Sequence, residues 1–114
     1  MSESILESTK KVLGIAADYT AFDMDIVMHI NSALATLNQL GVGPDAGFFI
    51  EDDSAEWGDF VGEDPRYNQV RSYVYLKVRL IFDPPATSFV IAAMEKQIQE
   101  HEWRLNVLRE GERA

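Results

Sequence analysis

The sequence predicts an all-α protein, a small bundle of about four helices, and three observations favour this class. Apolar residues recur at spacings of three or four along most of the chain, which is the period of an amphipathic helix. Residues that begin or end helices stand at the edges of these segments. The 114 residues, 46% of them hydrophobic, fit one compact domain spanning 1–114. We also expect a long acidic loop between the second and third helices and a long, partly projecting C-terminal helix.

The first helix is expected over residues 4–13. Ser4 followed by Glu7 has the form of a capping box, in which each side chain bonds the other residue's backbone N–H. Gly14 suits the end of a helix, because glycine adopts the left-handed conformation that commonly follows the last turn.

The second helix is expected over residues 21–40. Thr20 and Asp23 repeat the start signal, and Gly41 follows the last apolar residue. The apolar stripe consists of Phe22, Ile26, Ile30, Leu34, Leu37 and Leu40. His29 stands one residue off this stripe, which favours a boundary or surface position over a role as ligand or base.

The segment over residues 41–65 is rich in Gly, Pro and Asp, yet it carries apolar and aromatic side chains. These are Phe48, Phe49, Ile50, Trp57, Phe60 and Val61. A disordered linker would lack them, so we expect an ordered loop that packs its aromatic rings against the bundle. Phe48 to Ile50 favours a short extended stretch, and Asp53 with Glu56 favours the cap of a brief helical turn.

The acidic residues of this loop invite a calcium interpretation, which the spacing contradicts. Asp45 and Glu56 are correctly placed as the ends of a 12-residue calcium loop. However, Gly47 and Phe49 stand where oxygen ligands are needed, and Ile50 stands where the sharp turn needs glycine. We therefore expect no metal here.

The third helix is expected over residues 65–82, because Asp64 before Pro65 is a strong helix start. Its apolar residues form two stripes, one of Tyr67, Val70, Val74, Val78 and Ile81 and a second of Tyr73, Leu76 and Leu80. Two stripes imply contact with more than one neighbour, which predicts a central position in the bundle.

Pro84 and Pro85 separate the third helix from a fourth, expected over residues 88–109. Each proline biases the preceding residue away from helical dihedrals, so the third helix ends near Phe82 and Thr87 or Ser88 caps the next one. The apolar seam of the fourth helix consists of Ile91, Met94, Ile98, His101, Leu105 and Leu108.

The two halves of this fourth helix are expected to differ in role. The half up to Ile98 is predicted to pack against the bundle, and the half from Gln99 onward is predicted to project toward a partner. A tryptophan with Arg and Leu neighbours is typical of interface positions that carry much of the binding energy. The predicted partner-binding residues are Trp103, Arg104, Leu105, Val107 and Leu108.

Charge is distributed unevenly along the chain. Residues 1–64 hold 13 acids against two lysines, a net of −11, while residues 65–114 hold 8 bases against 6 acids, a net of +2. An acidic surface repels phosphate backbones, so tight DNA binding is disfavoured. A solvated acidic face that aids solubility and a role toward a partner both remain open.

The sequence contains no catalytic, cofactor-binding or metal-binding constellation, so we expect no enzyme activity and no cofactor. It holds no cysteine and only His29 and His101, which leaves neither a thiolate nucleophile nor an adjacent base. No run approaches the roughly 18 apolar residues that cross a bilayer, and the N-terminus lacks the form of a signal peptide. We expect a soluble intracellular protein that does not enter a membrane.

The order of these segments resembles the small helical head-tail connector proteins of long-tailed phages, also called adaptors or head-completion (DNA-packaging) proteins. The likeness lies in ILESTKKVLGI, DYTAFDMDIVMHINSALATLNQLGVGP, DDSAEWGDF and YVYLKVRLIFDPPATSFVIAAMEKQIQEHEWRLN, in that order. It covers nearly the whole chain, and LKVRLIFDPP followed by EWRLN is its most specific part.

The resemblance implies a structural protein that forms a homo-oligomeric ring, commonly of about a dozen copies, under the portal protein at the capsid vertex. Such a ring extends the DNA channel, lets DNA pass without tight binding, and supports the stopper or tail-completion protein. The implied location is the head-tail junction of the virion, with the host cytoplasm before assembly. A small acidic helical interaction module or regulator stays open as the alternative.

Overall fold

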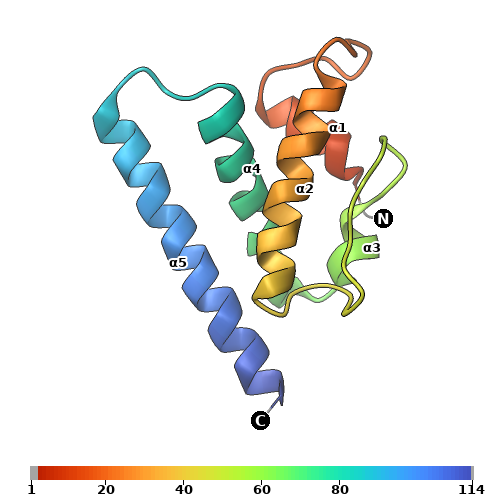
Figure 1. The fold of residues 1–114 in the computed structure, drawn as a ribbon, viewed down its shortest axis with the longest axis vertical. Coiled ribbons are helices and arrows are strands. Elements are labelled where there is room, and N and C mark those ends of the chain that lie inside the picture. The colour runs from red at the N-terminus through yellow and green to blue at the C-terminus, as the bar shows by residue number, and fades with distance from the viewer. Residues whose placement is uncertain (1–2, 114) are drawn as a thin grey trace.

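The computed structural model describes residues 3–113, and its regular structure is helical (Figure 1). The elements are α1 (Ile5–Val12), α2 (Asp23–Gln39), α3 (Trp57–Val61), a 3₁₀ turn η1 (Pro65–Tyr67), α4 (Gln69–Phe82) and α5 (Ser88–Arg113). The described residues form no β-strand, apart from one isolated bridge between Ser4 and Glu56. The predicted all-α bundle is confirmed. Residues 1–2 and 114 of the predicted domain lie outside the described part of the chain.

Helix α1 begins and ends where its sequence signals predict. The Ser4 hydroxyl accepts a hydrogen bond from the Glu7 N–H at 3.2 Å, which satisfies one of the free donors of the first turn. Gly14, just past the helix, has a φ of +79°, a conformation that residues with a Cβ rarely adopt. The helix is amphipathic, and Ile5 and Leu6 are buried against the rest of the bundle.

Helix α2 begins two residues later than predicted, and the predicted Thr20–Asp23 cap does not form. Phe22 occupies the capping position without a side-chain hydrogen bond. The Asp23 carboxylate instead lies 2.7 Å from the Nζ of Lys10 on α1. A tertiary ion pair has therefore replaced the local cap. Within the helix the predicted apolar stripe is confirmed, since Ile26, Ile30, Leu34 and Leu37 are fully buried, but Phe22, just before the helix, is 42% exposed, and its place on the buried stripe is wrong.

The segment between α2 and η1 is ordered and packs most of its apolar side chains inward, as predicted, but the prediction is wrong for Phe49, which is 66% exposed. Asn31 on α2 holds it through two hydrogen bonds to Ile50, one to the backbone carbonyl (2.9 Å) and one from the backbone N–H (2.8 Å). Trp57 and Phe60 are buried. The Phe60 ring approaches Gly43 so closely that a Cβ there would lie 2.4 Å from it, so this position requires glycine.

The expected extended stretch at residues 48–50 forms no strand, but the brief helical turn is present as α3. Glu56 caps it together with Asp59, whose carboxylate accepts a hydrogen bond from the Glu56 N–H at 2.9 Å. The prediction that Asp53 is the capping residue is therefore wrong, because the cap lies three residues later, at Glu56. Capping at Glu56 places Trp57 in the first turn, where its indole N–H donates to the Ser8 hydroxyl at 2.9 Å. This bond ties the loop to α1.

Helix α4 is the centre of the bundle, as its two apolar stripes predict. It contacts α1, α2 and α5. Asp64 caps the preceding turn by accepting from the Arg66 N–H at 3.0 Å. Val70, Tyr73, Val74 and Val78 are buried, whereas Ile81 is 57% exposed, while its neighbours Leu80 and Phe82 pack against the core. The prediction of a buried Ile81 is therefore wrong.

Helix α5 runs from Ser88 to Arg113, four residues beyond the predicted end. Thr87 caps it, accepting a hydrogen bond from the Val90 N–H at 3.4 Å. The predicted seam is confirmed, since all of its members are buried or partly buried: Ile91, Met94, Ile98, His101, Leu105 and Leu108. The face of the helix that meets the bundle is thus readable from the sequence.

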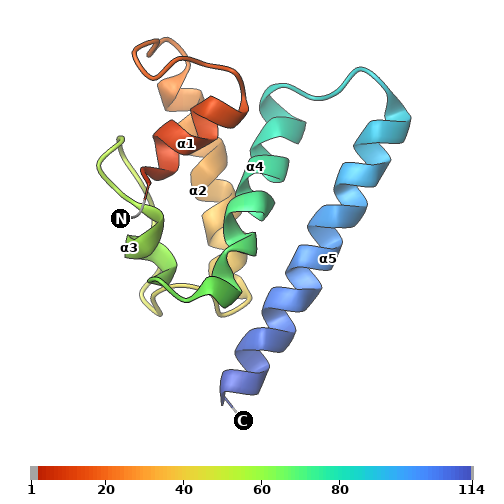
Figure 2. The ribbon, with the colours of Figure 1, turned by 180° about the vertical axis from the view of Figure 1, so that it is seen from behind.

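The bundle covers the second half of α5 more completely than the first, whereas the sequence predicted that the first half packs and the second half projects; a partner-binding role for the second half stays a prediction. Residues 88–97 include no buried side chain, while Ile98 and Leu105 are buried further along. Figures 1 and 2 show the reason: the loop that follows Phe82 carries the chain away from α4, and α5 approaches the bundle only toward its C-terminal half. Periodicity defines a face of a helix, but the angle between two helices decides where along its length that face is covered.

Candidate partner-binding site

The two histidines lie apart, on different helices, and neither has the neighbours of a catalytic base. His29 is partly buried on α2. His101 on α5 places its Nδ1 3.0 Å from the Gln69 side-chain oxygen, and its partial burial lowers its pKa. Among residues 3–113, no group of three or more His, Asp or Glu side chains is arranged to hold a metal ion. No helix in that range has the length and apolar character to cross a bilayer.

The five predicted partner-binding residues divide between two faces of α5. Trp103 is 67% exposed, Val107 is 47% exposed, and Arg104 is exposed with an ion pair of 3.9 Å to Glu100 one turn earlier. Leu105 is fully buried. Because successive residues rotate by about 100° around a helix, Leu105 points away from Trp103.

Leu105 and Leu108 therefore serve the protein's own core. Leu105 belongs to the central cluster of buried residues, and Leu108 packs against that cluster. The expectation that Leu105 faces a partner is wrong for this conformation, because its side chain has no accessible surface. Trp103, Arg104 and Val107 stay available, and the structure leaves their role as partner-binding residues a prediction.

A hydrogen bond inside the bundle fixes the second half of α5. The Tyr73 hydroxyl on α4 donates to the Glu102 carboxylate at 2.7 Å. Burial, together with the neighbouring carboxylate, raises the pKa of the Tyr73 phenol, so the hydroxyl keeps its proton and remains a donor. An open groove of about 480 Å³ also lies between α4 and α5. It is lined by Ser72, Tyr75, Leu76, Gln97, Glu100, His101 and Arg104.

Large apolar side chains are exposed at three separate places that the sequence analysis did not identify as surfaces. Phe89 at the start of α5 is 83% exposed, Met24 at the start of α2 is 84% exposed, and Phe49 in the acidic loop is 66% exposed. Met24 lies two residues from the stripe residues Phe22 and Ile26, and Phe89 lies two residues before the seam residue Ile91. Phe49 alternates with buried Ile50, as side chains do along an extended backbone.

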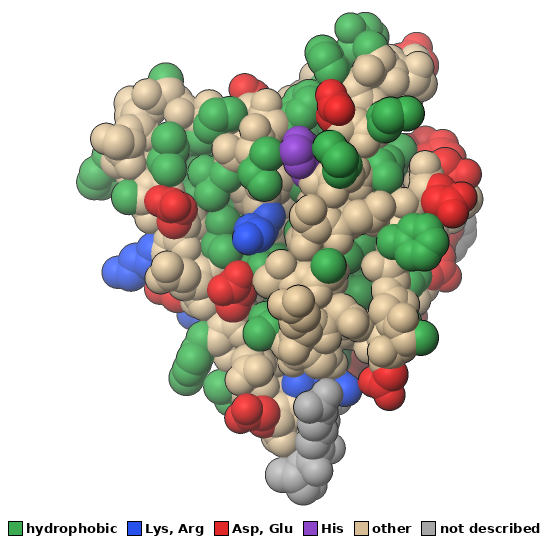
Figure 3. Space-filling model, viewed as in Figure 1, with side chains coloured by type: hydrophobic (Ala, Val, Ile, Leu, Met, Phe, Trp, Pro, Cys, Tyr) green, Lys and Arg blue, Asp and Glu red, His purple; other side chains and the backbone are tan. Residues whose placement is uncertain are grey.

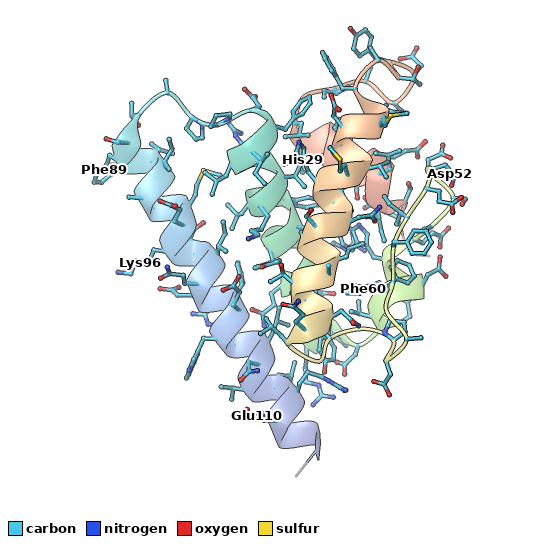
Figure 4. The ribbon with its side chains drawn as sticks, viewed as in Figure 1. His29, Asp52, Phe60, Phe89, Lys96 and Glu110 are labelled. Atoms are coloured by element: carbon cyan, nitrogen blue, oxygen red, sulfur yellow. The ribbon has the colours of Figure 1, made fainter. Side chains whose placement is uncertain are left out.

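Acidic side chains are concentrated on one edge of the molecule. In Figure 3, acidic side chains gather along the edge formed by the loop between α2 and α3, where Figure 4 labels Asp52. Lys96 lies on the opposite edge, on α5 (Figure 4). The Asp52 carboxylate accepts hydrogen bonds from the backbone N–H (2.9 Å) and the hydroxyl (2.6 Å) of Ser54, and these bonds lower its pKa. The loop therefore presents a fixed negative charge.

Comparison with protein families decides the identity of this helical, strongly acidic chain. The family model described as phage connector protein matches residues 5–112. The chain belongs to the phage connector protein family. The match covers the connector from the first residue of α1 almost to the end of α5, so it includes every helix described above. It confirms the resemblance that the order of segments indicates. No curated protein and no solved structure matches the connector significantly.

Proposed function

We propose that the connector is a structural head-tail connector that assembles as a homo-oligomeric ring under the portal protein. The ring, of about a dozen copies, extends the DNA channel and supports the stopper or tail-completion protein. The observation that carries this proposal is the match to the connector family over residues 5–112. The resemblance of the segment order to head-tail connectors supports the more specific role.

The charge of the connector suits a channel that conducts DNA. The chain carries a net charge of −9, with 13 of its 19 acids in residues 1–64. Proteins that bind DNA tightly neutralise its phosphates with Lys and Arg and release the condensed counterions. An acidic surface offers no such gain, so DNA passes without being held.

The proposed connector has no enzymatic role, in keeping with a family whose function is structural. Its site of action is the head-tail junction of the virion, and it occupies the host cytoplasm before it assembles. Exposed apolar side chains such as Phe89 and Trp103 are typical of a protein that buries more surface after folding.

The portal-binding element in this proposal is the outer face of the second half of α5. Trp103 and Val107 present apolar surface there, and Arg104 adds a charged, exposed side chain that can pair with an acid on the portal. Leu105 and Leu108 lie behind these residues and hold the helix in place.

Native mass spectrometry, with and without portal particles, tests the proposal. We expect copies of the connector to accumulate on portal particles as a ring, and Trp103→Ala to weaken binding to the portal by about tenfold or more. Val12→Ala is the control, because Val12 is also exposed (45%) but lies on α1. A connector that stays monomeric or dimeric with portal present, or that instead binds promoter DNA, supports the alternative of an interaction module or regulator.

A further inference from the structure

We infer that copies of the connector join head to tail, through the outer face of the first half of α5 on one copy and the acidic loop on the next. The α5 outer face comprises Phe89, Val90, Ala92, Ala93 and Lys96, all of them exposed. The loop face comprises Phe49, Glu51, Asp52 and Asp53, also exposed. This inference rests on the proposed ring and names the surfaces that build it.

The α5 outer face is an apolar strip without a neighbour in the isolated connector. Phe89 is 83% exposed and Val90 43% exposed, and two exposed alanines follow within the next turn. The inner seam of the same helix is only partly buried at Ile91 and Met94 and is first buried at Ile98. A helix that presents apolar residues on its solvent side as well as its inner side has a second surface to bury.

The loop face has an apolar centre and an acidic surround, and it is held in place before any partner arrives. Phe49 is 66% exposed, while the next residue, Ile50, is buried and bonded on both its N–H and its carbonyl by Asn31. Asp52 is held by Ser54. A preformed surface loses little conformational entropy on binding, which favours association.

Charge selects the pairing of these two faces. The loop face carries three consecutive acids, Glu51 to Asp53, and no Lys or Arg occurs between Val12 and Pro65. Two loop faces placed together would repel each other. The α5 outer face contains Lys96, which can meet the loop acids while Phe89 meets Phe49. The head-to-tail contact thus pairs Phe89 with Phe49 and places one base, Lys96, opposite the three acids of the loop face. The exposed Glu95 lies about 120° around the helix from Phe89, off the α5 outer face.

Because the two faces lie on opposite edges of the molecule, the same contact can form between each copy and the next. Figure 4 shows Phe89 and Lys96 on one edge of the molecule and Asp52 on the other, across a molecule whose principal extents are 44, 35 and 22 Å. Each copy therefore offers both faces at once. A contact between two different surfaces is heterologous, and repeating it generates a ring when the rotation closes.

Site-specific cross-linking tests the inference, and the connector suits it because the chain has no cysteine. Phe49→Cys and Phe89→Cys are prepared separately, mixed on portal particles and treated with a short bis-maleimide. We expect the mixed dimer to form about tenfold more than either homodimer, and the double variant to give a ladder of multimers. Glu7→Cys, on the exposed side of α1, is the control and should give little product with either variant. Homodimers of Phe89→Cys in excess, or no product above the control, would overturn the inference.

A charge exchange provides a second test that does not require contact at one chosen pair of atoms. Lys96→Glu alone and Asp52→Lys with Asp53→Lys alone should each reduce multimer formation, and mixing the two variants should restore it. If the mixture does not recover multimer formation, the proposed pairing of the two faces is contradicted.

Portal binding by single connector copies is measured in parallel. If those copies bind the portal but do not pair as described, this inference fails while the portal-binding part of the proposed function stands; if nothing binds the portal, that function fails.

Discussion

At the scale of single residues, Lys10 shows how a buried charge joins three parts of the fold. Lys10 is 1% exposed, and its ammonium group donates to the backbone carbonyls of Ala17 (3.1 Å) and Tyr19 (2.8 Å) and lies 2.7 Å from the Asp23 carboxylate. Burying an ammonium ion is costly unless oxygen atoms surround it. Here they come from the loop after α1 and from the start of α2, so one lysine fixes both.

Replacing Lys10 by methionine should destabilise the connector by about 2 kcal/mol or more, because two backbone carbonyls and a carboxylate lose their donor. Lys11 is the matched control, since it is the next residue and is exposed. Lys11→Met should change the free energy of unfolding by less than about 0.5 kcal/mol. Denaturant titration of both variants measures the difference. Equal effects would show that the Lys10 contacts do not stabilise the fold.

Tyr73 gives a prediction that depends on pH. Its phenol pKa is raised above the unfolded value of 10.0, so the folded state keeps the proton when the unfolded chain has begun to lose it. The stability that Tyr73 provides is therefore complete below about pH 10 and declines as the pH rises further. Tyr73→Phe should cost about 1 kcal/mol at pH 7. The gap between wild type and variant should narrow above pH 10, and a constant gap in denaturant titrations would contradict this.

At the scale of the elements, the sequence is most informative about where helices begin and which face they bury. Ser4, Asp64 and Thr87 cap the helical segments as predicted, because capping depends on side chains a few residues apart. The start of α2 escaped prediction because Asp23 is paired with Lys10, thirteen positions away in the sequence. Tertiary contacts of this kind leave no local pattern.

The candidate site was predictable to the same limited degree. Trp103 and Val107 are accessible, as their positions off the seam imply, while Leu105 sits on the seam and is buried. The exposed start of α5 could not be foreseen, because the seam residues Ile91 and Met94 follow the same period as Ile98. Only the path of the loop before α5 determines which of them the bundle covers.

Removing residues after Ile98 should therefore unfold the connector rather than release a dispensable arm. The truncation takes away Leu105 and the Glu102 partner of Tyr73. In the full-length chain, Leu105→Ala should cost about 3 kcal/mol, as is usual for emptying a buried leucine site. Val107→Ala, on the exposed face, should cost less than about 1 kcal/mol. Thermal melting followed by circular dichroism tests this. A truncated chain that melts like the wild type would contradict the assignment.

At the scale of the whole molecule, α4 and α5 form an open helical hairpin, and α4 also packs within the bundle with α1 and α2. α4 and α5 are wide apart at the loop that holds Pro84 and Pro85 and converge toward the other end (Figure 2). Proline fixes φ near −65° and restricts the residue before it, so two in succession leave the loop few conformations. The loop thereby determines the angle at which α5 leaves α4.

Replacing both prolines by alanine should leave the core folded and loosen this angle. Spin labels on Ile81→Cys and Phe89→Cys, one on each side of the loop, report the separation of the two helix ends in a chain that has no other cysteine. The distance distribution should broaden in the double alanine variant, because alanine admits many more backbone conformations. A distribution as narrow as that of the parent chain would show that packing, and not the prolines, sets the angle.

The uneven burial along α5 has a consequence for the motion of the helix. Its backbone is continuous from Ser88 to Arg113, yet the side chains that anchor it, Ile98 and Leu105, lie beyond its first ten residues. Local opening is easiest where few apolar contacts must be broken. Backbone amides of residues 92–97 should therefore exchange with deuterated solvent faster than those of residues 102–108. We therefore expect α5 to pivot about the residues near Leu105, with the largest displacement at its Phe89 end.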